Sequence, residues 1–261
     1  MNDLGAELAA IAADIRAILD DTRSRGVLAE PEAALPAASP WVSDTLAAPD
    51  AAPAADSLDP WVALAAPPPV APAERLAAVR DDLGDCRRCG LCKDRHNIVF
   101  GVGAESAELV VVGEGPGHDE DLKGEPFVGP AGQMLDRMLL NVLGLAREQV
   151  YIANVVKCRP PGNRNPLPEE ISACKPFLER QLLAIRPKVI LVLGAIALRA
   201  LTGSDQGISK QRGLWHDWRG IEVLPTFHPA YLLRNPDEKK KTFEDLKKLK
   251  VRLDEIRGGK A

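Results

Sequence analysis

The chain is poor in aromatic residues and lacks the segments that mark membrane and secreted proteins. Aromatic side chains make up 4% of its 261 residues, and alanine supplies much of the apolar content. No run of about 18 apolar residues is present, so no transmembrane helix is expected. The N-terminus lacks a basic stretch followed by an apolar one, which argues against a secretory signal. We therefore expect a cytoplasmic protein with reduced thiols and no membrane partner.

Basic residues are scarce in the first part of the chain. Residues 1–72 contain three Arg and eleven Asp or Glu, a balance of −8, whereas the whole chain has a formal charge of −4. The remaining residues therefore carry +4, and the acidic character of the protein belongs to its N-terminal part. A mildly basic C-terminal part is compatible with a polyanionic partner but does not identify one.

The N-terminal part divides into two segments by composition. Residues 1–26 have apolar side chains at helical spacing, which predicts an amphipathic helix that either binds a protein partner or packs locally. Residues 27–72 are rich in Ala and Pro, and this composition predicts a disordered linker. Two Pro-Trp-Val triplets in the linker are docking motifs or chance repeats of a biased segment.

Strands and helices alternate between residues 73 and 257, where we expect the folded domain. Strands are predicted over residues 108–113, 150–156, 189–194 and 221–227, and helices over 133–143, 168–185, 195–201 and 238–256. This alternation is typical of an α/β fold with a mostly parallel sheet covered on both faces. The loops after Val112, Val156 and Thr226 leave the carboxyl ends of strands, where ligands bind in such sheets. We therefore expect these loops to form one site.

Five cysteines provide the most specific spacing in the chain. Cys86 and Cys89 form a Cys-x-x-Cys pair. Cys158 and Cys174 form a second pair further along the chain, with fifteen residues between them. Zinc ribbons usually have two Cys-x-x-Cys pairs, whereas iron–sulfur clusters accept less regular spacing. Cys92 extends the first pair to a ferredoxin-like run and is an alternative ligand. Five unrelated thiols are the structural alternative, and a disulfide framework is not expected in a chain of this size.

Three loops contain residues suited to binding or catalysis. The loop Gly113–Gly117 lets backbone N–H groups approach a ligand, but its glycine spacing does not match a nucleotide-binding fingerprint. His228 lies at a strand end just before a proline, which suits a positioned hydrogen-bond donor. The segment Asn154–Pro166 joins a strand, a cysteine and basic residues that could face a nucleic-acid backbone. A plain tight turn, a structural histidine and a solvated loop are the corresponding alternatives.

Taken together, these motifs resemble the family 4, iron–sulfur uracil-DNA glycosylases over residues 86–249. The matching segments are Cys-x-x-Cys (86–89), IVFG (98–101), GEGPG (113–117), PFVGPAG (126–132), NVVKCRPPGNRNP (154–166), RPKVILVLG (186–194) and HPAYLLR (228–234). The resemblance implies a three-layer α/β/α sandwich with a four-stranded parallel sheet. It also implies a monomeric DNA repair enzyme that hydrolyses the N-glycosidic bond of flipped-out deoxyuridine. The first third of the chain lies outside it.

The resemblance further implies roles for individual residues. The ligands of a [4Fe–4S] cluster would be Cys86, Cys89, Cys158 and Cys174, which leaves Cys92 spare. Phe127 would stack on uracil, and Asn154 would hydrogen-bond its Watson–Crick edge. His228 would hydrogen-bond the uracil O2 and stabilise negative charge on the departing base.

Other expected contacts surround this centre. Glu120 would wall the pocket where the methyl group of thymine would lie. Gly115 stands where family 1 enzymes carry a water-activating Asp, so Glu114 is the candidate that activates water. The expected DNA-binding residues are Arg159, Arg164, Leu232 and Arg234.

Two other functions are weighed against the glycosylase. One is an iron–sulfur protein that binds DNA or a polymerase without catalysis, and the other is a zinc-stabilised nucleotide-binding protein. A binding protein would not need Asn154, Phe127 and His228 together, so these residues favour the enzyme. The nucleotide-binding alternative is disfavoured because the chain lacks a phosphate-binding loop pattern.

Overall fold

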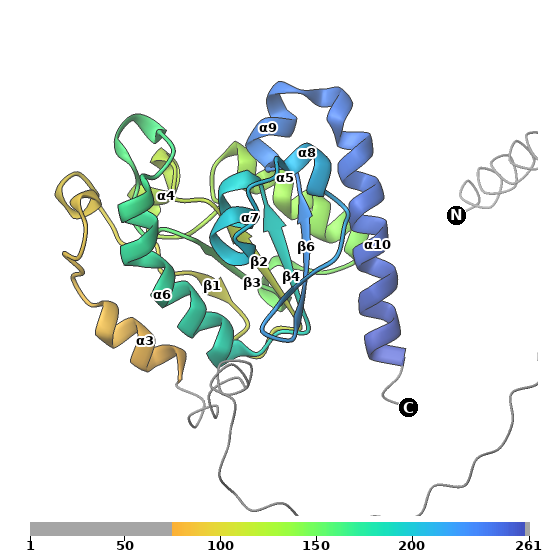
Figure 1. Cartoon of the computed structure of the whole chain (residues 1–261), viewed down its shortest axis with the longest axis horizontal. Coiled ribbons are helices and arrows are strands. Elements are labelled where there is room, and N and C mark those ends of the chain that lie inside the picture. The colour runs from red at the N-terminus through yellow and green to blue at the C-terminus, as the bar shows by residue number, and fades with distance from the viewer. Residues whose placement is uncertain (1–74, 259–261) are drawn as a thin grey trace, which may run out of the picture. The chain divides into compact units, whose positions relative to one another are not determined.

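The computed structural model of the protein describes residues 75–258 (Figure 1). The helix and linker predicted over residues 1–72 lie outside the described residues. The helices are α3 (Leu76–Leu83), α4 (His118–Lys123), α5 (Pro130–Met138), α6 (Pro168–Ile185), α7 (Ala195–Thr202), α8 (Ile208–Gln211), α9 (Pro229–Arg234) and α10 (Lys239–Gly258). The strands are β1 (Val102–Gly103), β2 (Leu109–Gly113), β3 (Tyr151–Asn154), β4 (Val189–Leu193), β5 (His216–Trp218) and β6 (Ile221–Thr226).

The strands form one sheet in the order β1-β3-β2-β4-β6-β5. The central strands β3, β2, β4 and β6 are mutually parallel, so the predicted four-stranded parallel sheet forms the middle of a larger one. β1 and β5 pair antiparallel at the two edges. These edge strands are two and three residues long, too short to produce an alternating pattern that a sequence prediction could detect.

Helices cover both faces of the sheet. Alternate residues of β2 point to opposite faces, so Val110 packs with α3, α6 and α7 while Val111 packs with α5, α9 and α10. Figure 1 shows α3 beside α6 and α10 on the opposite flank of the sheet. All residues of β2 and β4 are buried, as expected for parallel strands covered on both sides. The predicted three-layer α/β/α arrangement is confirmed.

The helix predicted over residues 133–143 begins earlier and ends irregularly. α5 starts at Pro130, because a proline at the first helical position has no N–H to leave unpaired. The chain continues as one π-helical segment, η2 (Leu139–Leu143), and stops at Gly144, whose φ of 68° is in the left-handed region. This start places the N-terminus of α5 directly after the PFVG segment.

The carboxyl ends of the parallel strands meet at one edge of the sheet. Gly113 at the end of β2 pairs with Asn154 at the end of β3, and Leu193 pairs with Thr226 at the end of β6. The three motif-bearing loops therefore leave the sheet side by side, at the edge where ligands bind in parallel α/β proteins.

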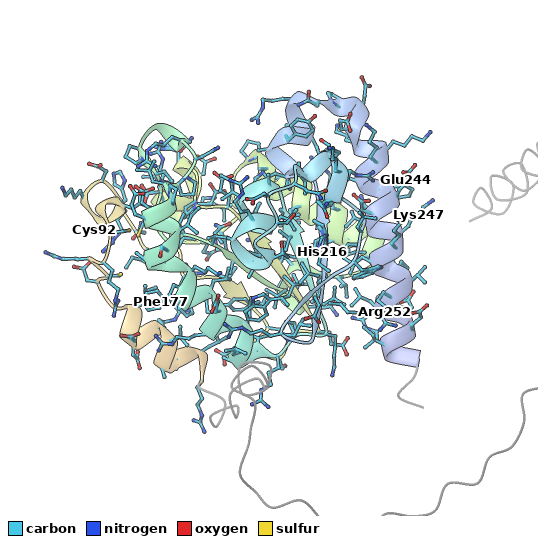
Figure 2. All side chains as sticks on the ribbon, viewed as in Figure 1. Cys92, Phe177, His216, Glu244, Lys247 and Arg252 are labelled. Atoms are coloured by element: carbon cyan, nitrogen blue, oxygen red, sulfur yellow. The ribbon has the colours of Figure 1, made fainter. Side chains whose placement is uncertain are left out.

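None of the helices in residues 75–258 has the length and apolar character needed to cross a membrane. The longest, α10, is rich in charge and carries the exposed Glu244 and Lys247, whereas Arg252 pairs with Glu222 of β6 (Figure 2).

Candidate functional site

A cavity of about 370 Å³ lies at the carboxyl ends of the parallel strands. The loops after β2, β3 and β6 form its walls, together with the segment between α4 and α5. Six residues expected to bind or convert substrate line it, namely Glu114, Gly115, Glu120, Phe127, Asn154 and His228. The structure therefore brings together residues that are more than 110 positions apart in the chain, from Glu114 to His228.

Asn154 supplies an unpaired hydrogen-bond acceptor to this cavity. Its side chain is 1% exposed, and its Oδ1 atom has no hydrogen-bond partner. Leaving a buried acceptor unpaired costs about 1–3 kcal/mol, a cost that a ligand N–H group would remove. The buried Lys157 Nζ donates to the backbone carbonyl oxygen of Asn154 at 2.8 Å. The backbone at Asn154 is therefore held in place, and the side-chain oxygen is left unpaired.

Gly113 leaves the space that Asn154 and Phe127 occupy. A Cβ atom at this position would lie 2.4 Å from Asn154 Oδ1 and 2.6 Å from Phe127 Cζ. Real Cβ atoms do not approach other atoms so closely, so any side chain at residue 113 would displace both walls of the cavity. The glycine is needed here for close packing, since its φ lies outside the left-handed region.

Phe127 presents an aromatic ring from a strained backbone. Its φ of 54° is in the left-handed region, which is unfavourable for a bulky residue. The ring centroid lies 5.5 Å from that of His228, and the two planes meet at 31°. A ring and an imidazole thus converge on one side of the cavity.

Arg147, which the sequence motifs do not single out, holds the Phe127 backbone. Its guanidinium donates to the carbonyl oxygens of Phe127 at 3.1 Å and of Pro126, and it pairs with Asp136 at 3.0 Å. Gly132 approaches from the other side, where a Cβ would lie 1.9 Å from the Phe127 carbonyl oxygen. The first turn of α5 and a distant arginine therefore enclose the strained residue.

Glu120 ties together the two loops that form the cavity wall. One carboxylate oxygen accepts from the Gly117 N–H at 3.0 Å. The other accepts from the N–H groups of Val128 at 2.9 Å and Gly129 at 3.1 Å. These bonds connect the GEGPG loop to the PFVG segment, so Glu120 fixes the shape of the cavity in addition to lining it.

His228 is a neutral hydrogen-bond donor. Its Nδ1 atom accepts from the Ala230 N–H at 3.1 Å at the start of α9, so the proton of a neutral ring is on Nε2. Burial, assisted by the positive charge of Arg234, lowers the pKa of His228 to about 4. The imidazole is therefore uncharged at neutral pH and offers one N–H to the cavity.

Glu114 and Gly115 follow directly after β2. Burial raises the pKa of the Glu114 carboxyl above its ordinary value, and among residues 75–258 this side chain has no hydrogen bond or ion pair. A carboxyl group of raised pKa suits proton transfer. Gly115 has no room for the Asp found in family 1 enzymes, since a Cβ would lie 2.7 Å from Val156 Cγ2.

The residues expected to contact DNA differ in their surroundings. Arg159 lies near the cavity mouth and donates to Asn163 at 2.7 Å, with the His118 ring nitrogen at 3.0 Å. Arg164 pairs with the buried Glu170 at 2.7 Å, where Glu170 also caps α6, so its charge is partly used within the fold. Arg234 lines the cavity at its exposed rim.

The expectation for Leu232 needs correction. Its side chain is 1% exposed and packs in the core with α5 and α10, so it does not reach the surface in this structure. The reason is the helical phase of α9, which turns residue 232 inward and the next residue outward. Leu233 is 40% exposed and is the leucine of this segment that a DNA strand could contact.

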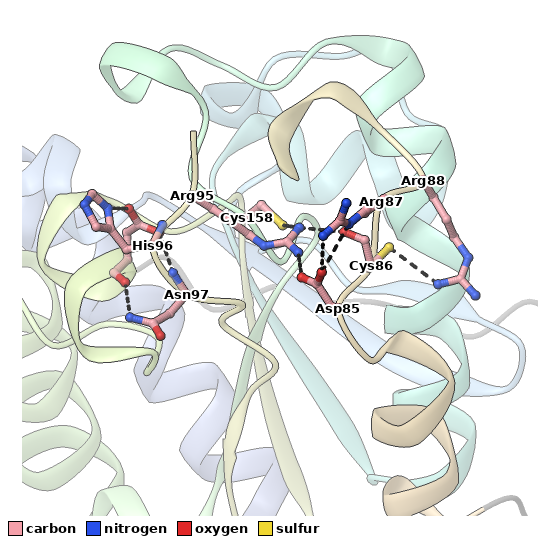
Figure 3. Close-up of polar contacts among 9 residues, drawn as sticks. Asp85, Cys86, Arg87, Arg88, Arg95, His96, Asn97 and Cys158 are labelled. Carbon is pink, nitrogen blue, oxygen red and sulfur yellow. Dashed lines mark hydrogen bonds and ion pairs between the residues drawn. The ribbon is translucent and has the colours of Figure 1, made fainter. Parts of the chain in front are cut away.

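The four cysteines expected to bind a metal cluster lie near one another. Burial is the main cause that raises the pKa values of Cys89, Cys158 and Cys174, and neighbouring cysteines raise them further. The pKa of Cys158 is raised to about 11. Three sulfurs accept hydrogen bonds, from Arg88 at 3.5 Å to Cys86, from Arg95 at 3.4 Å to Cys158 and from the Lys157 N–H at 3.2 Å to Cys174. Figure 3 shows Arg88 and Arg95 directed at these sulfurs. Such donors stabilise thiolates.

This arrangement fits an iron–sulfur cluster better than a single ion. Within residues 75–258, no three Cys, His, Asp or Glu side chains are close enough to hold one metal ion. A [4Fe–4S] cluster spreads its four thiolate ligands over four irons, so they lie further apart than the ligands of one zinc ion. Cys92 is half-buried beside Cys89, and no hydrogen bond to its sulfur is present in the described part of the chain.

Comparison with known proteins bears directly on this site. Residues 100–248 match the family model described as uracil DNA glycosylase superfamily. A type-4 uracil-DNA glycosylase of Thermotoga maritima is 48% identical over 181 residues, which is 68% of this chain and 94% of the relative. Type-4 uracil-DNA glycosylases of Archaeoglobus fulgidus and Saccharolobus solfataricus are 46% and 43% identical, covering 67% and 69% of this chain and 92% and 87% of the relatives. The matched regions contain every wall of the cavity.

Proposed function

The chain belongs to the uracil DNA glycosylase superfamily, and on that premise we propose that it releases uracil from DNA by hydrolysing the N-glycosidic bond, leaving an abasic site. One observation carries the proposal. Asn154, whose buried side-chain oxygen has no hydrogen-bond partner, lines a cavity together with an aromatic ring and a neutral imidazole. A pyrimidine with an N3–H group and two carbonyl oxygens is complementary to this set.

Base recognition follows from the chemistry of Asn154 and Phe127. The glycosidic bond is inaccessible in a duplex, so the nucleotide must rotate out of the stack into the cavity. The Phe127 ring would stack on the base, and Asn154 Oδ1 would accept the uracil N3–H. Cytosine has no proton on N3, so it would leave this acceptor unpaired and face a second acceptor. Sites of this kind discriminate strongly, because the wrong ligand leaves a buried polar group unsatisfied.

Bond cleavage would use His228 and Glu114. As the bond between C1′ and N1 breaks, its electron pair leaves with uracil, and the His228 Nε2–H would donate to the developing negative charge on O2. A neutral imidazole can fill this role because its remaining proton is on Nε2. Water would form the new bond to C1′ and transfer a proton to Glu114, whose raised pKa favours accepting it.

We further propose that Cys86, Cys89, Cys158 and Cys174 hold a [4Fe–4S] cluster. The support is the proximity of the sulfurs and the three N–H donors directed at them. When bound, the cluster would join the segment before β1 to the loop after β3 and to α6. Its thiolate ligands require a reducing environment, which agrees with the expected cytoplasmic location. Base recognition and bond cleavage are assigned to the cavity residues and not to the cluster.

Release of uracil from a uracil-containing oligonucleotide tests the proposal. The wild-type protein is expected to produce free uracil and an alkali-labile abasic site, and Asn154→Ala and His228→Ala are each expected to lose at least about 100-fold in kcat/KM. Asn141→Ala is the matched control, because Asn141 is exposed on η2 away from the cavity.

The same assay separates the enzyme from a non-catalytic binding protein. A protein that retains the cluster absorbance near 400 nm and binds the oligonucleotide, yet releases no uracil, would be the binding protein and would refute the proposed activity. Equal activity of Asn154→Ala and wild type would refute the proposed recognition alone.

A further inference from the structure

Helix α4 carries two adjacent acidic residues that bond in different directions. Glu120 accepts the three N–H groups of the cavity loops described above. Asp121 is completely buried, and its carboxylate bonds to the segment that follows the first cysteines. A six-residue helix therefore contacts both the cavity loops and the cysteine-rich segment.

The bonds of Asp121 are numerous for one side chain. Its Oδ1 accepts from the N–H groups of His96 at 2.9 Å and Asn97 at 3.2 Å, and its Oδ2 lies 2.8 Å from His96 Nδ1. In return, Asn97 Nδ2 donates to the α4 carbonyls of Asp121 at 2.8 Å and Leu122 at 3.1 Å. Figure 3 labels His96 and Asn97, and dashed lines mark their polar contacts. Buried charge-assisted hydrogen bonds of this kind are stronger than neutral ones.

The same segment is fixed to the cysteines by Arg95. This side chain is 7% exposed and donates to the Cys86 carbonyl oxygen at 2.6 Å and to Cys158 Sγ at 3.4 Å. Residues 95–97 are thus fixed at one end to two expected cluster ligands and at the other to α4. A continuous set of short polar contacts leads from the sulfurs through Asp121 and Glu120 to the backbone of the PFVG segment.

We propose that α4 couples the cysteine centre to the uracil pocket, with Asp121 as the positioning residue that transmits the coupling. The proposal rests on the proposed function and on the cluster ligands named above. If the cysteine segment shifts, Asp121 shifts α4, and Glu120 then releases the N–H groups that hold Phe127 in its strained conformation. Coupling between two binding sites is reciprocal, so a ligand in the pocket must also stabilise the cysteine centre.

The reciprocal effect gives a test that does not depend on activity. Holoprotein is mixed with an iron chelator, and loss of absorbance near 400 nm is followed with and without saturating free uracil. Uracil is expected to slow cluster loss in wild type by about fivefold or more, the low end of typical couplings. In Asp121→Asn, whose amide cannot accept all three donors, the protection is expected to fall below about twofold.

A second measurement tests the path itself. Hydrogen exchange of the backbone amides of residues 127–129 is compared between holoproteins of equal iron content. Exchange in Asp121→Asn is expected to be about tenfold faster than in wild type, because Glu120 no longer holds Val128 and Gly129. The double variant His96→Ala, Asn97→Ala keeps both backbone donors to Asp121, so it should fold normally and show a smaller acceleration.

The control is Arg87→Ala. Arg87 lies in the same segment, and the substitution removes only its exposed ion pair with Asp85 at 2.9 Å. It should keep full uracil protection. Unchanged exchange at residues 127–129 in Asp121→Asn with the cluster retained would overturn the coupling. So would the absence of uracil protection in a wild-type protein that releases uracil from DNA. A protein that shows the exchange effect but releases no uracil would refute the proposed function and leave the coupling supported.

Discussion

The most informative single substitution outside the cavity is Arg147→Met. Methionine keeps an unbranched apolar side chain but removes the hydrogen bonds to the carbonyl oxygens of Pro126 and Phe127 and the ion pair with Asp136. Phe127 has a φ of 54°, and a residue held in this region stores about 1–3 kcal/mol of strain that the surroundings must offset. Without the guanidinium, the segment is free to relax and carry the ring out of stacking position.

The size of the effect follows from these contacts. Hydrogen bonds from a charged donor contribute about 1.5–3 kcal/mol each, and the Arg147 side chain is 20% exposed, which reduces that contribution. If about 2 kcal/mol of support for the strained conformation is lost, the equilibrium constant between the competent and relaxed conformations falls about 30-fold. Because a ligand binds only the competent state, kcat/KM for uracil release should fall with the competent fraction, by up to this factor.

The assay is uracil release from a single-stranded oligonucleotide at low substrate concentration, with the thermal midpoint measured on the same samples. Arg147→Lys retains one donor and should recover part of the loss. Arg137→Met is the control, since Arg137 is exposed on α5 and makes no hydrogen bond or ion pair within residues 75–258. A kcat/KM within twofold of wild type for Arg147→Met would show that the segment keeps Phe127 in place unaided, and the reasoning would be wrong.

Three further changes test other parts of the site. Gly113→Ala places a Cβ 2.4 Å from Asn154 Oδ1, so kcat/KM should fall at least about tenfold with a lowered thermal midpoint, and near-normal activity would contradict the packing argument. The pKa of His228 is lowered from 6.5 to about 4, so the pH profile of kcat/KM should show no step near pH 6.5 that belongs to this residue. The contribution of His228 to the free energy of unfolding should be full above pH 6.5 and decline as the pH falls toward 4. A step near pH 6.5 that His228→Gln abolishes would refute this. Cys158→Ser should abolish the 400 nm absorbance while Cys92→Ser keeps it, and iron and sulfide analysis of both variants decides whether Cys92 is a ligand.

Most of the central sheet could be predicted from the sequence because its strands are buried on both faces. Runs such as Val189–Leu193 contain only apolar residues, and this continuous pattern is typical of parallel strands. The helix predicted over residues 168–185 has those bounds in the structure, since a proline at its first position and a left-handed residue at its end mark the limits. α4 and α9 are six residues each and lack the length for a periodic signal.

The site was predictable to a different extent. Asn154, Phe127 and His228 follow strands or turns in recognisable motifs, and the register of the parallel strands brings those loops together. Arg147 and Asp121 could not be predicted, because each acts on backbone atoms of a segment more than 19 positions away and leaves no local pattern. Leu232 was expected to contact DNA, and the phase of a short helix places it in the core.

Side chains that bond to the backbone of the cavity loops are hard to predict from the sequence, and they also determine how the site works. The cavity walls are loops, and loops ordinarily lack the internal hydrogen bonds that fix helices and strands. Here charged side chains supply those bonds, Arg147 from outside the cavity and Glu120 from its wall. Arg147 donates to the backbone of Phe127, and Glu120 accepts from Gly117, Val128 and Gly129. A flipped base has already lost its stacking and pairing, so a pocket that also had to become ordered on binding would lose further affinity. Fixing the loops in advance removes that cost, and the substitutions that matter most beyond the cavity should therefore be those that touch only its backbone.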